Sequence, residues 1–354
     1  MKKMTKQILI RLTALLIAIC LLPVISIAEE TKEENSKWVS FLLICNEGMN
    51  NDKGNAGNTL MVAAMDPVLG KICLMMFTWD TFIDYEGYDV PQKLDMPYRN
   101  NGPEEAVKVF NDNFNLNINH YLSLNYLNLA SLIDEYGGIN VDITRAERNA
   151  INGMVGSKKI RLQEEAASGQ LGQTVIDMLA QEYYLNDFGP NTHLNGLQAV
   201  GYGWLQYDSV YNCCERDAKV VAALFHSAGS YIADKVALYT DKSGKPEDTF
   251  GRRPINMDHV SDEDYEFLRE QIAPIFQMSV NNMEEDEIRT ITLSLAHIAY
   301  QAEREGTSIF DLIRTTILPL EATKPYDIVA GTKGHLVNKE ANIEAVRDFL
   351  NSED

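Results

Sequence analysis

Short apolar segments typical of strands alternate with amphipathic segments typical of helices along most of this chain. This alternation favours an α/β fold, because helices that follow strands cover both faces of a sheet. Strands are expected at residues 38–45, 59–65, 71–78, 121–124 and 139–143, with a helix-to-strand pattern at 196–205. Helices are expected at residues 103–114, 127–136, 173–184, 215–234, 262–276, 284–303, 308–317 and 338–351. No linker rich in Pro, Ser or Gly follows residue 40 and no internal repeat is present, so one domain is predicted.

The first 28 residues have the pattern of an export signal. Four cations accompany an apolar run over residues 12–28, which ends in Ser26-Ile27-Ala28 before acids begin at Glu29. A basic start, an apolar middle and a small-x-small end are typical of a secretory signal peptide. The run has the minimum length for crossing a bilayer, so cleavage after Ala28 is favoured over an N-terminal membrane anchor. Residues 29–37 then form a short acidic spacer, residues 38–354 form the domain, and the protein is expected in the cell envelope or the extracellular space.

The chain is strongly acidic, with 31 Lys and Arg residues against 51 Asp and Glu residues and a net charge of −20. Without a surplus of cations a protein cannot displace the counterions of nucleic-acid phosphates, so a nucleic-acid partner is excluded. The same charge disfavours an anionic membrane surface as a partner of the folded domain. Membrane contact is therefore expected only through residues 1–28, if these stay uncleaved.

Four cysteines follow the export signal, too few to hold a domain of this size together by disulfides. Cys45 and Cys73 lie in strand-like apolar segments and are predicted to be buried packing residues. The adjacent Cys213 and Cys214 are expected as free or buried thiols, the alternative being an exposed pair that oxidises. The sequence has no CxxC, HExxH or clustered-histidine spacing, so a zinc site is not expected. Dinucleotide-binding, P-loop and GxSxG motifs are absent from it as well.

Eight short segments are informative because of their order. They are Asn58-Thr59-Leu60-Met61-Val62, Asp66-Pro67, Phe77-Thr78-Trp79-Asp80-Thr81, Lys93-Leu94 with Tyr98, Gly102-Pro103-Glu104, Asn119-His120-Tyr121, Tyr136-Gly137-Gly138-Ile139-Asn140-Val141-Asp142 and His193-Leu194-Asn195-Gly196-Leu197-Gln198-Ala199. In this order they resemble the LytR-CpsA-Psr family, also called the cell envelope-related transcriptional attenuator domain. The resemblance runs from about residue 38 to the C-terminal helix.

The resemblance implies a three-layer α/β/α sandwich with a mixed central sheet, whose apolar pocket holds a lipid. It also implies an exported protein of Gram-positive-type bacteria. The implied activity is that of a phosphotransferase, which moves glycopolymers from a polyprenyl-pyrophosphate carrier onto peptidoglycan with magnesium. The implied partners are therefore a polyprenyl-linked glycan and peptidoglycan.

That activity places strong demands on the site. The negative charge of a pyrophosphate beside a lipid pocket has to be neutralised by arginine side chains and by a metal ion held by carboxylates. The family meets them with Arg-Ser-Asp-Thr, Arg-Asp-Thr, Arg-x-Arg and Arg-x-x-Arg segments. The matching positions here read Ala56-Gly57-Asn58-Thr59, Trp79-Asp80-Thr81, Trp204-Leu205-Gln206 and Cys213-Cys214-Glu215-Arg216. Each charge-assisted contact to phosphate contributes about 1.5–3 kcal/mol, so the intact family mechanism is not expected.

The retained charges, Asp80 and Arg216, are the candidate catalytic residues, and Asp80 is also the candidate magnesium ligand. Each has a structural alternative, because Asp80 could cap the end of its strand and Arg216 could pair with Glu215. The candidate ligand-binding residues are Asn58, Trp79, Lys93, Trp204, Gln206 and Cys213. The two tryptophans could stack on a sugar ring or fill the space of the missing arginines.

Three functions stay open on this basis. The first is a divergent, non-catalytic family member that binds a polyprenyl-linked or glycan ligand. The second is an active glycopolymer phosphotransferase with a rearranged site around Asp80 and Arg216. The third is a secreted scaffold module that keeps only the fold, because a fold does not fix a function. A deep apolar cavity would favour the first two, and a core filled with side chains the third.

Overall fold

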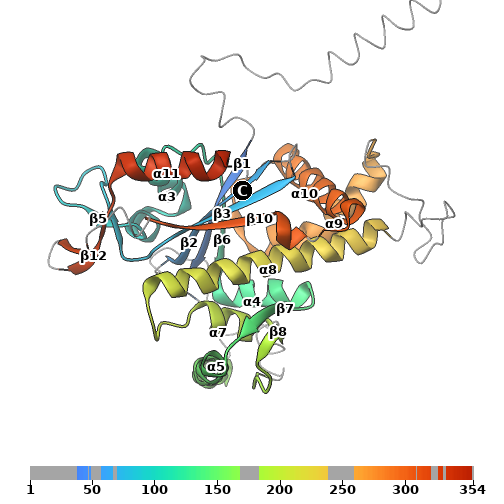
Figure 1. Ribbon diagram of the computed structural model, residues 1–354, viewed down its shortest axis with the longest axis horizontal. Coiled ribbons are helices and arrows are strands. Elements are labelled where there is room, and N and C mark those ends of the chain that lie inside the picture. Colours follow the sequence, from blue (N-terminus) through green and yellow to red (C-terminus); the bar gives the residue numbers. More distant parts are fainter. Residues whose placement is uncertain are drawn as a thin grey trace, which may run out of the picture. The chain divides into compact units, whose positions relative to one another are not determined.

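A mixed sheet forms the centre of the fold, and within the described residues it has six strands in the order β10-β3-β2-β1-β6-β9 (Figure 1). β2 pairs antiparallel with both β1 and β3. β1 pairs parallel with β6, and β3 pairs parallel with β10. These strands are β1 (Val39–Asn46), β2 (Gly57–Asp66), β3 (Lys71–Phe77), β6 (His120–Asn125), β9 (Val280–Asn281) and β10 (Ile313–Leu318).

The computed structural model describes residues 38–46, 48, 57–66, 70–167, 183–237, 259–307, 309–319, 326–329 and 332–352. At some positions inside these ranges, Asn58 among them, only the backbone is described. The expected signal peptide and spacer, residues 1–37, lie outside the described residues. Most of the helix expected at 173–184 lies outside them too.

Helices cover both faces of the sheet, because successive side chains of its strands point to opposite faces and are apolar on both. In β2, Leu60, Val62 and Ala64 pack with the helices of one face, whereas Met61 and Ala63 pack with those of the other. The first face is covered by α3 (Pro103–Phe114) and α11 (Lys339–Asn351), with α2 (Met96–Asn101) beside them. The second face is covered by α8 (Val210–Ala237), α9 (Asp262–Met278) and α10 (Glu285–Glu305). The expected three-layer α/β/α sandwich is thereby confirmed.

A second apolar core lies on the other side of α8. It contains buried side chains of α4 (Tyr126–Glu135), β7 (Ile139–Ile143), α5 (Arg145–Ala167), β8 (Gly189–Leu194) and α7 (Gly196–Gly203). The two faces of α8 therefore differ in what they touch. Cys214, Ala218 and Ala222 join the core against the sheet, while Val220 and Ala223 join the second core. The spacing of each set is three or four residues, which places each on its own side of the helix.

A smaller sheet closes the end of β3. Its order among the described residues is β11-β12-β4-β5, and β12 pairs parallel with β4. This pairing places His335 opposite Thr81, so the C-terminal region reaches the turn that follows β3. The strands are β4 (Thr81–Ile83), β5 (Gln92–Lys93), β11 (Tyr326–Val329) and β12 (Thr332–Leu336).

Most of the expected elements are confirmed, and the helix at 103–114 and the strand at 139–143 have the expected bounds. The helix expected at 308–317 is wrong, since a short 3-10 turn, η1 (Ile309–Leu312), leads into strand β10. The strand expected at the end of 196–205 is also wrong, because Trp204 is the C-cap of α7. No described helix is both long and apolar enough to cross a membrane.

Candidate functional site

Asp80 lies in the turn between β3 and β4 and is 1% exposed. Its Oδ1 lies 3.1 Å from Nδ1 of His335, and the backbone amide of His335 donates to the Asp80 carbonyl at 3.0 Å. Tyr211, at the start of α8, lies edge-on to the imidazole, with ring centroids 5.7 Å apart. Among the described residues, no hydrogen-bond donor reaches Oδ2 of Asp80. The carboxyl is thus buried and tied to the C-terminal region.

Trp79 stands where the resemblance implies an arginine, and its neighbour is a lysine. Nζ of Lys93 lies 5.4 Å from the centroid of the Trp79 ring, which is within the range of a cation–π contact. The indole Nε1 is buried, and no described residue accepts its hydrogen bond. The side chain of Asn58 lies outside the described residues, although its backbone belongs to β2. Two of the candidate ligand-binding residues, Trp79 and Lys93, are therefore in contact.

Arg216 is buried in the first turns of α8, at 4% exposure. Its Nη1 and Nη2 donate to the two carboxylate oxygens of Asp208 at 2.8 and 2.7 Å, and Nη2 also donates to the carbonyl of Leu205. Burial alone would lower the pKa of Arg216, but the hydrogen bonds to Asp208 raise it, and they lower the pKa of Asp208. Glu215, the expected local partner, pairs with Lys219 instead. The two Nη atoms of Arg216 are therefore occupied by hydrogen bonds within the protein.

Asp217 is a second buried acid of the site, at 6% exposure. Its Oδ2 accepts a hydrogen bond from the hydroxyl of Thr59 at 2.8 Å. A Cβ added at Gly203 would lie 2.4 Å from Oδ1, so the close approach of α7 to this carboxyl requires a glycine. Burial raises the pKa of Asp217 to about 8, and the hydrogen bond from Thr59 only partly opposes this rise. The side chain is consequently protonated and neutral at pH 7.

Cys213 and Cys214 are free thiols, and both are buried. The sulfur of Cys213 donates to the carbonyl of Gly203 at 3.5 Å, and that of Cys214 to the carbonyl of Phe77 at 3.9 Å. Burial raises the pKa of Cys213 to about 12 and raises that of Cys214 still further. The expectation of free or buried thiols is confirmed. A protonated, buried thiol is a poor nucleophile, so this pair offers no reactive thiolate.

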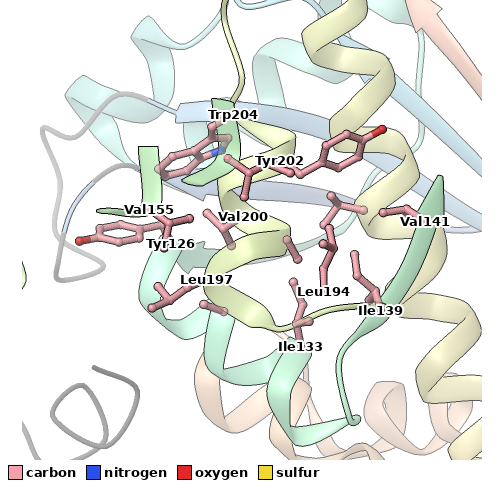
Figure 2. Close-up of a cluster of buried hydrophobic side chains, with 14 of the residues drawn as sticks. Tyr126, Ile133, Ile139, Val141, Val155, Leu194, Leu197, Val200, Tyr202 and Trp204 are labelled. Atoms are coloured by element: carbon pink, nitrogen blue, oxygen red, sulfur yellow. The ribbon is translucent and has the colours of Figure 1, made fainter. Parts of the chain in front are cut away.

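Trp204 is buried in the second core, 5.6 Å from the ring of Tyr126 between centroids (Figure 2). Nζ of Lys158, which comes from α5, lies 4.5 Å from the Trp204 ring and 4.4 Å from the Tyr126 ring. Gln206, by contrast, is exposed. Trp204 thus contributes to the apolar core, and the cation close to it is a lysine from another helix.

A small apolar cavity lies between the sheet and its second helical layer. Its volume is about 30 Å³, and it is lined by apolar side chains of β3, α8, α9 and α10 that include Ile72, Phe225 and Ile272. That volume has room for about one or two water molecules. A polyprenyl chain would not fit it in this conformation.

Asp80 does not by itself make a magnesium site. Magnesium requires near-octahedral oxygen ligands and keeps several waters. Asp80 supplies one carboxylate, which is 1% exposed and has one oxygen against His335. In the part of the chain that the structure describes, no group of three or more Asp, Glu, His or Cys side chains is placed to hold a metal ion.

The fold brings the start of α8 against the ends of β2 and β3, through the contacts Asp217–Thr59 and Cys214–Phe77. Sequence reasoning missed Asp208, Asp217 and His335. Asp217 had a detectable signal, because it follows Cys213 by four residues and precedes Val220 by three on one side of an amphipathic helix. Asp208 and His335 had none, since one precedes the helix in a loop and the other arrives through strand pairing.

The comparisons with known proteins agree with this architecture. The model of the LytR_cpsA_psr family matches residues 24–231, which is more than half of the chain. The chain therefore belongs to the LytR_cpsA_psr family, a family of α/β/α domain proteins.

Solved structures of similar fold cover most of the chain. TagV of B. subtilis has a TM-score of 0.55 and 16% sequence identity, and the match covers 89% of this chain and 96% of TagV. TagT bound to LIIa-WTA has a TM-score of 0.54 and 12% identity, over 92% of this chain and 93% of TagT. These likenesses establish the fold alone.

A relative matches a shorter segment. The polyisoprenyl-teichoic acid–peptidoglycan teichoic acid transferase TagU of Enterococcus faecalis is 32% identical over 85 residues, which are 24% of this chain and 28% of that protein. The match thus spans less than a third of the relative's length.

We expect Arg216→Gln to destabilise the fold by about 1–3 kcal/mol, because it leaves Asp208 and the Leu205 carbonyl without their donor. Urea unfolding measures this difference. Arg269→Gln is the matched control, since the Arg269–Glu285 pair is exposed and should contribute less than about 1 kcal/mol. If Arg216→Gln proved as harmless as the control, the guanidinium would not be a structural group.

We expect Asp217→Asn to remove a pH dependence of stability. Between the unfolded pKa of 3.8 and the folded pKa of about 8, the unfolded chain releases a proton that the folded chain keeps. The free energy of unfolding of the wild type should therefore fall as pH rises through this window, by at most about 1.4 kcal/mol per pH unit. Asparagine can still accept the hydrogen bond from Thr59 but does not titrate.

The measurement is urea unfolding at several values between pH 5 and pH 8, for the wild type, Asp217→Asn and the exposed-site control Asp286→Asn. The advantage of Asp217→Asn over the wild type should grow with pH, whereas the control should follow the wild type. A constant difference across this range would show that the buried carboxyl is ionised in the folded state.

Proposed function

We propose that this chain is exported to the cell envelope and acts there as a non-catalytic family member, which binds a polyprenyl-linked or free glycan through its glycan part without transferring it. The observation that carries this proposal is the state of Arg216. Arg216 is 4% exposed, and its guanidinium donates three hydrogen bonds to Asp208 and Leu205. A pyrophosphate could recruit it only after these bonds were broken, at a cost of about 1.5–3 kcal/mol for each bond to the charged partner.

The other positions support the same proposal. Trp79, Trp204, Gln206 and Cys213 carry no charge where the family pattern has arginines. Stabilisation of a phosphoryl-transfer transition state is mostly electrostatic, and neutral side chains cannot replace guanidinium forks. Lys93 and Lys158 provide nearby cations, but both lie over aromatic rings. The relative from Enterococcus faecalis, a teichoic acid transferase by name, motivates a glycan as the class of ligand.

The test is a transfer assay with the full chain, a polyprenyl-pyrophosphate-linked glycopolymer and peptidoglycan, with and without magnesium. TagU of Enterococcus faecalis serves as the positive control. We expect product at the level of the protein-free reaction, both for the wild type and for Asp80→Asn. Magnesium-dependent transfer by the wild type that Asp80→Asn abolishes would instead establish the rearranged active site around Asp80 and Arg216.

A second candidate function is binding of the carrier lipid itself. It is favoured by the cavity between β3, α8, α9 and α10, whose lining is apolar throughout. Because this cavity holds only about 30 Å³, we expect native mass spectrometry of the exported protein to detect no polyprenyl lipid. A co-purified lipid would mean that the helices separate from the sheet to admit it, and would favour this second candidate over a glycan-binding or scaffold role.

A further inference from the structure

The connection between β4 and β5 forms one wall of a cleft that is separate from the site described above. The cleft has a volume of about 510 Å³ and is lined by residues 84–91, by Asp112 and Asn113 of α3, and by Lys339 at the start of α11. That volume is in the range of about 300–1,000 Å³ typical of small-ligand sites. Neither Arg216 nor Asp80 belongs to its lining.

Two stacked tyrosines provide an aromatic platform in this cleft. The rings of Tyr85 and Tyr88 are stacked, with centroids 5.2 Å apart and an angle of 19° between their planes. Tyr85 is buried at 7% exposure, and its hydroxyl accepts a hydrogen bond from Asn101 at 2.6 Å. Tyr88 is 48% exposed, and the amide of Asn100 lies 3.5 Å from its hydroxyl. The stacked pair is therefore fixed before a ligand arrives, and it leaves Tyr88 half open to solvent.

The backbone that carries this platform is fixed too. The side-chain amide of Asn113, itself buried, donates to the carbonyls of Asp84 and Val109. This bridge attaches the end of β4 to α3. The cleft thus has a supported wall, which lowers the conformational cost of binding.

The charged side chains that line the cleft are mostly negative. Four carboxylates, those of Asp84, Glu86, Asp89 and Asp112, face one cation, Lys339. Glu86 is partly neutralised from outside the lining by Lys108, at 3.1 Å. Among the described residues these carboxylates form no metal-binding group, so they are spread along the cleft and do not converge on one ion. Spread acceptors suit an extended ligand with several donors, and the excess of negative charge suits a cationic one.

From this combination we propose that the cleft binds a short saccharide that carries protonated amino groups. One sugar ring lies on the open face of Tyr88, where aromatic contact and cation–π attraction act together. Its ammonium and hydroxyl groups donate to the carboxylates of Asp89 and Asp112. This inference goes beyond the proposed function, because it concerns a second site and holds whether or not the chain transfers glycopolymers.

The test is isothermal titration calorimetry of the full chain with a fully deacetylated glucosamine tetramer. Two further ligands distinguish the contribution of the sugar from that of the positive charge. The N-acetylated tetramer keeps the sugar and loses the charge, whereas tetralysine keeps the charge and loses the sugar. We expect the deacetylated tetramer to bind at least tenfold more tightly than either, and its affinity to fall as salt rises.

Substitutions of residues that line the cleft test whether the saccharide binds there. We expect Tyr88→Ala and Asp112→Asn each to weaken binding at least tenfold, and Tyr88→Phe, which keeps the ring, to stay within about twofold of the wild type. Tyr184→Ala, at an exposed aromatic residue outside the lining, is the matched control and should bind like the wild type. Circular dichroism and thermal melting confirm that each variant is folded.

Three outcomes would overturn the proposal: no binding by the wild type, equal binding of the N-acetylated tetramer or of tetralysine, or unchanged binding by folded Tyr88→Ala. None of them would bear on transfer activity, which is measured separately. Failure of this inference and failure of the proposed function are therefore distinguishable.

Discussion

The burial of α8 on two sides is the constraint on which the rest of the structure depends. One side of this helix packs on the central sheet through Cys214, Ala218 and Ala222, and another packs on the second core through Val220 and Ala223. Glu215 and Lys219 lie on the exposed side of its first turns, but residues on the two packed sides have little access to water. Any charged or titratable group placed there has to find its partner within the protein, because an unpaired buried charge is very costly.

Arg216 and Asp217 meet this constraint in different ways. Arg216 stays charged and closes a bidentate pair with Asp208, which leads the chain from α7 into α8. Asp217 has no hydrogen-bonded cation among the described residues and becomes neutral instead, which costs less free energy than keeping a buried carboxylate charged. Arg216, a candidate catalytic residue, and Asp217 thereby both support the junction of α7, α8 and β2.

The layered fold could be predicted from the sequence because the apolar residues recur with the spacing typical of strands and helices. The strands β1 to β3 are apolar on both faces, and α3 shows a Pro-Glu-Glu start and an apolar stripe. The prediction failed where pairing between strands that are distant in the sequence determines the secondary structure. The segment 309–318, in which Asp311 and Arg314 interrupt apolar residues, suits a helix as well as a strand. Only the parallel pairing of residues 313–318 with β3 makes them β10. The partner of Asp80 was unpredictable for the same reason, since His335 is 255 residues away in the sequence and arrives with β12. Asp208 is only eight residues from Arg216, but it lies in a loop that has no periodic pattern.

The loss of charge at the site and the completeness of the core are linked. Trp204 packs against Tyr126, and Cys213 is buried against the carbonyl of Gly203. An arginine at either position would need a counter-charge or an anionic ligand to offset its desolvation. In a chain without that ligand, an apolar side chain is the more stable choice, and each such exchange weakens the site for the ligand further. Trp204 and Cys213 are accommodated in this way by the packing of the described residues, whereas Arg216 keeps its charge through the pair with Asp208.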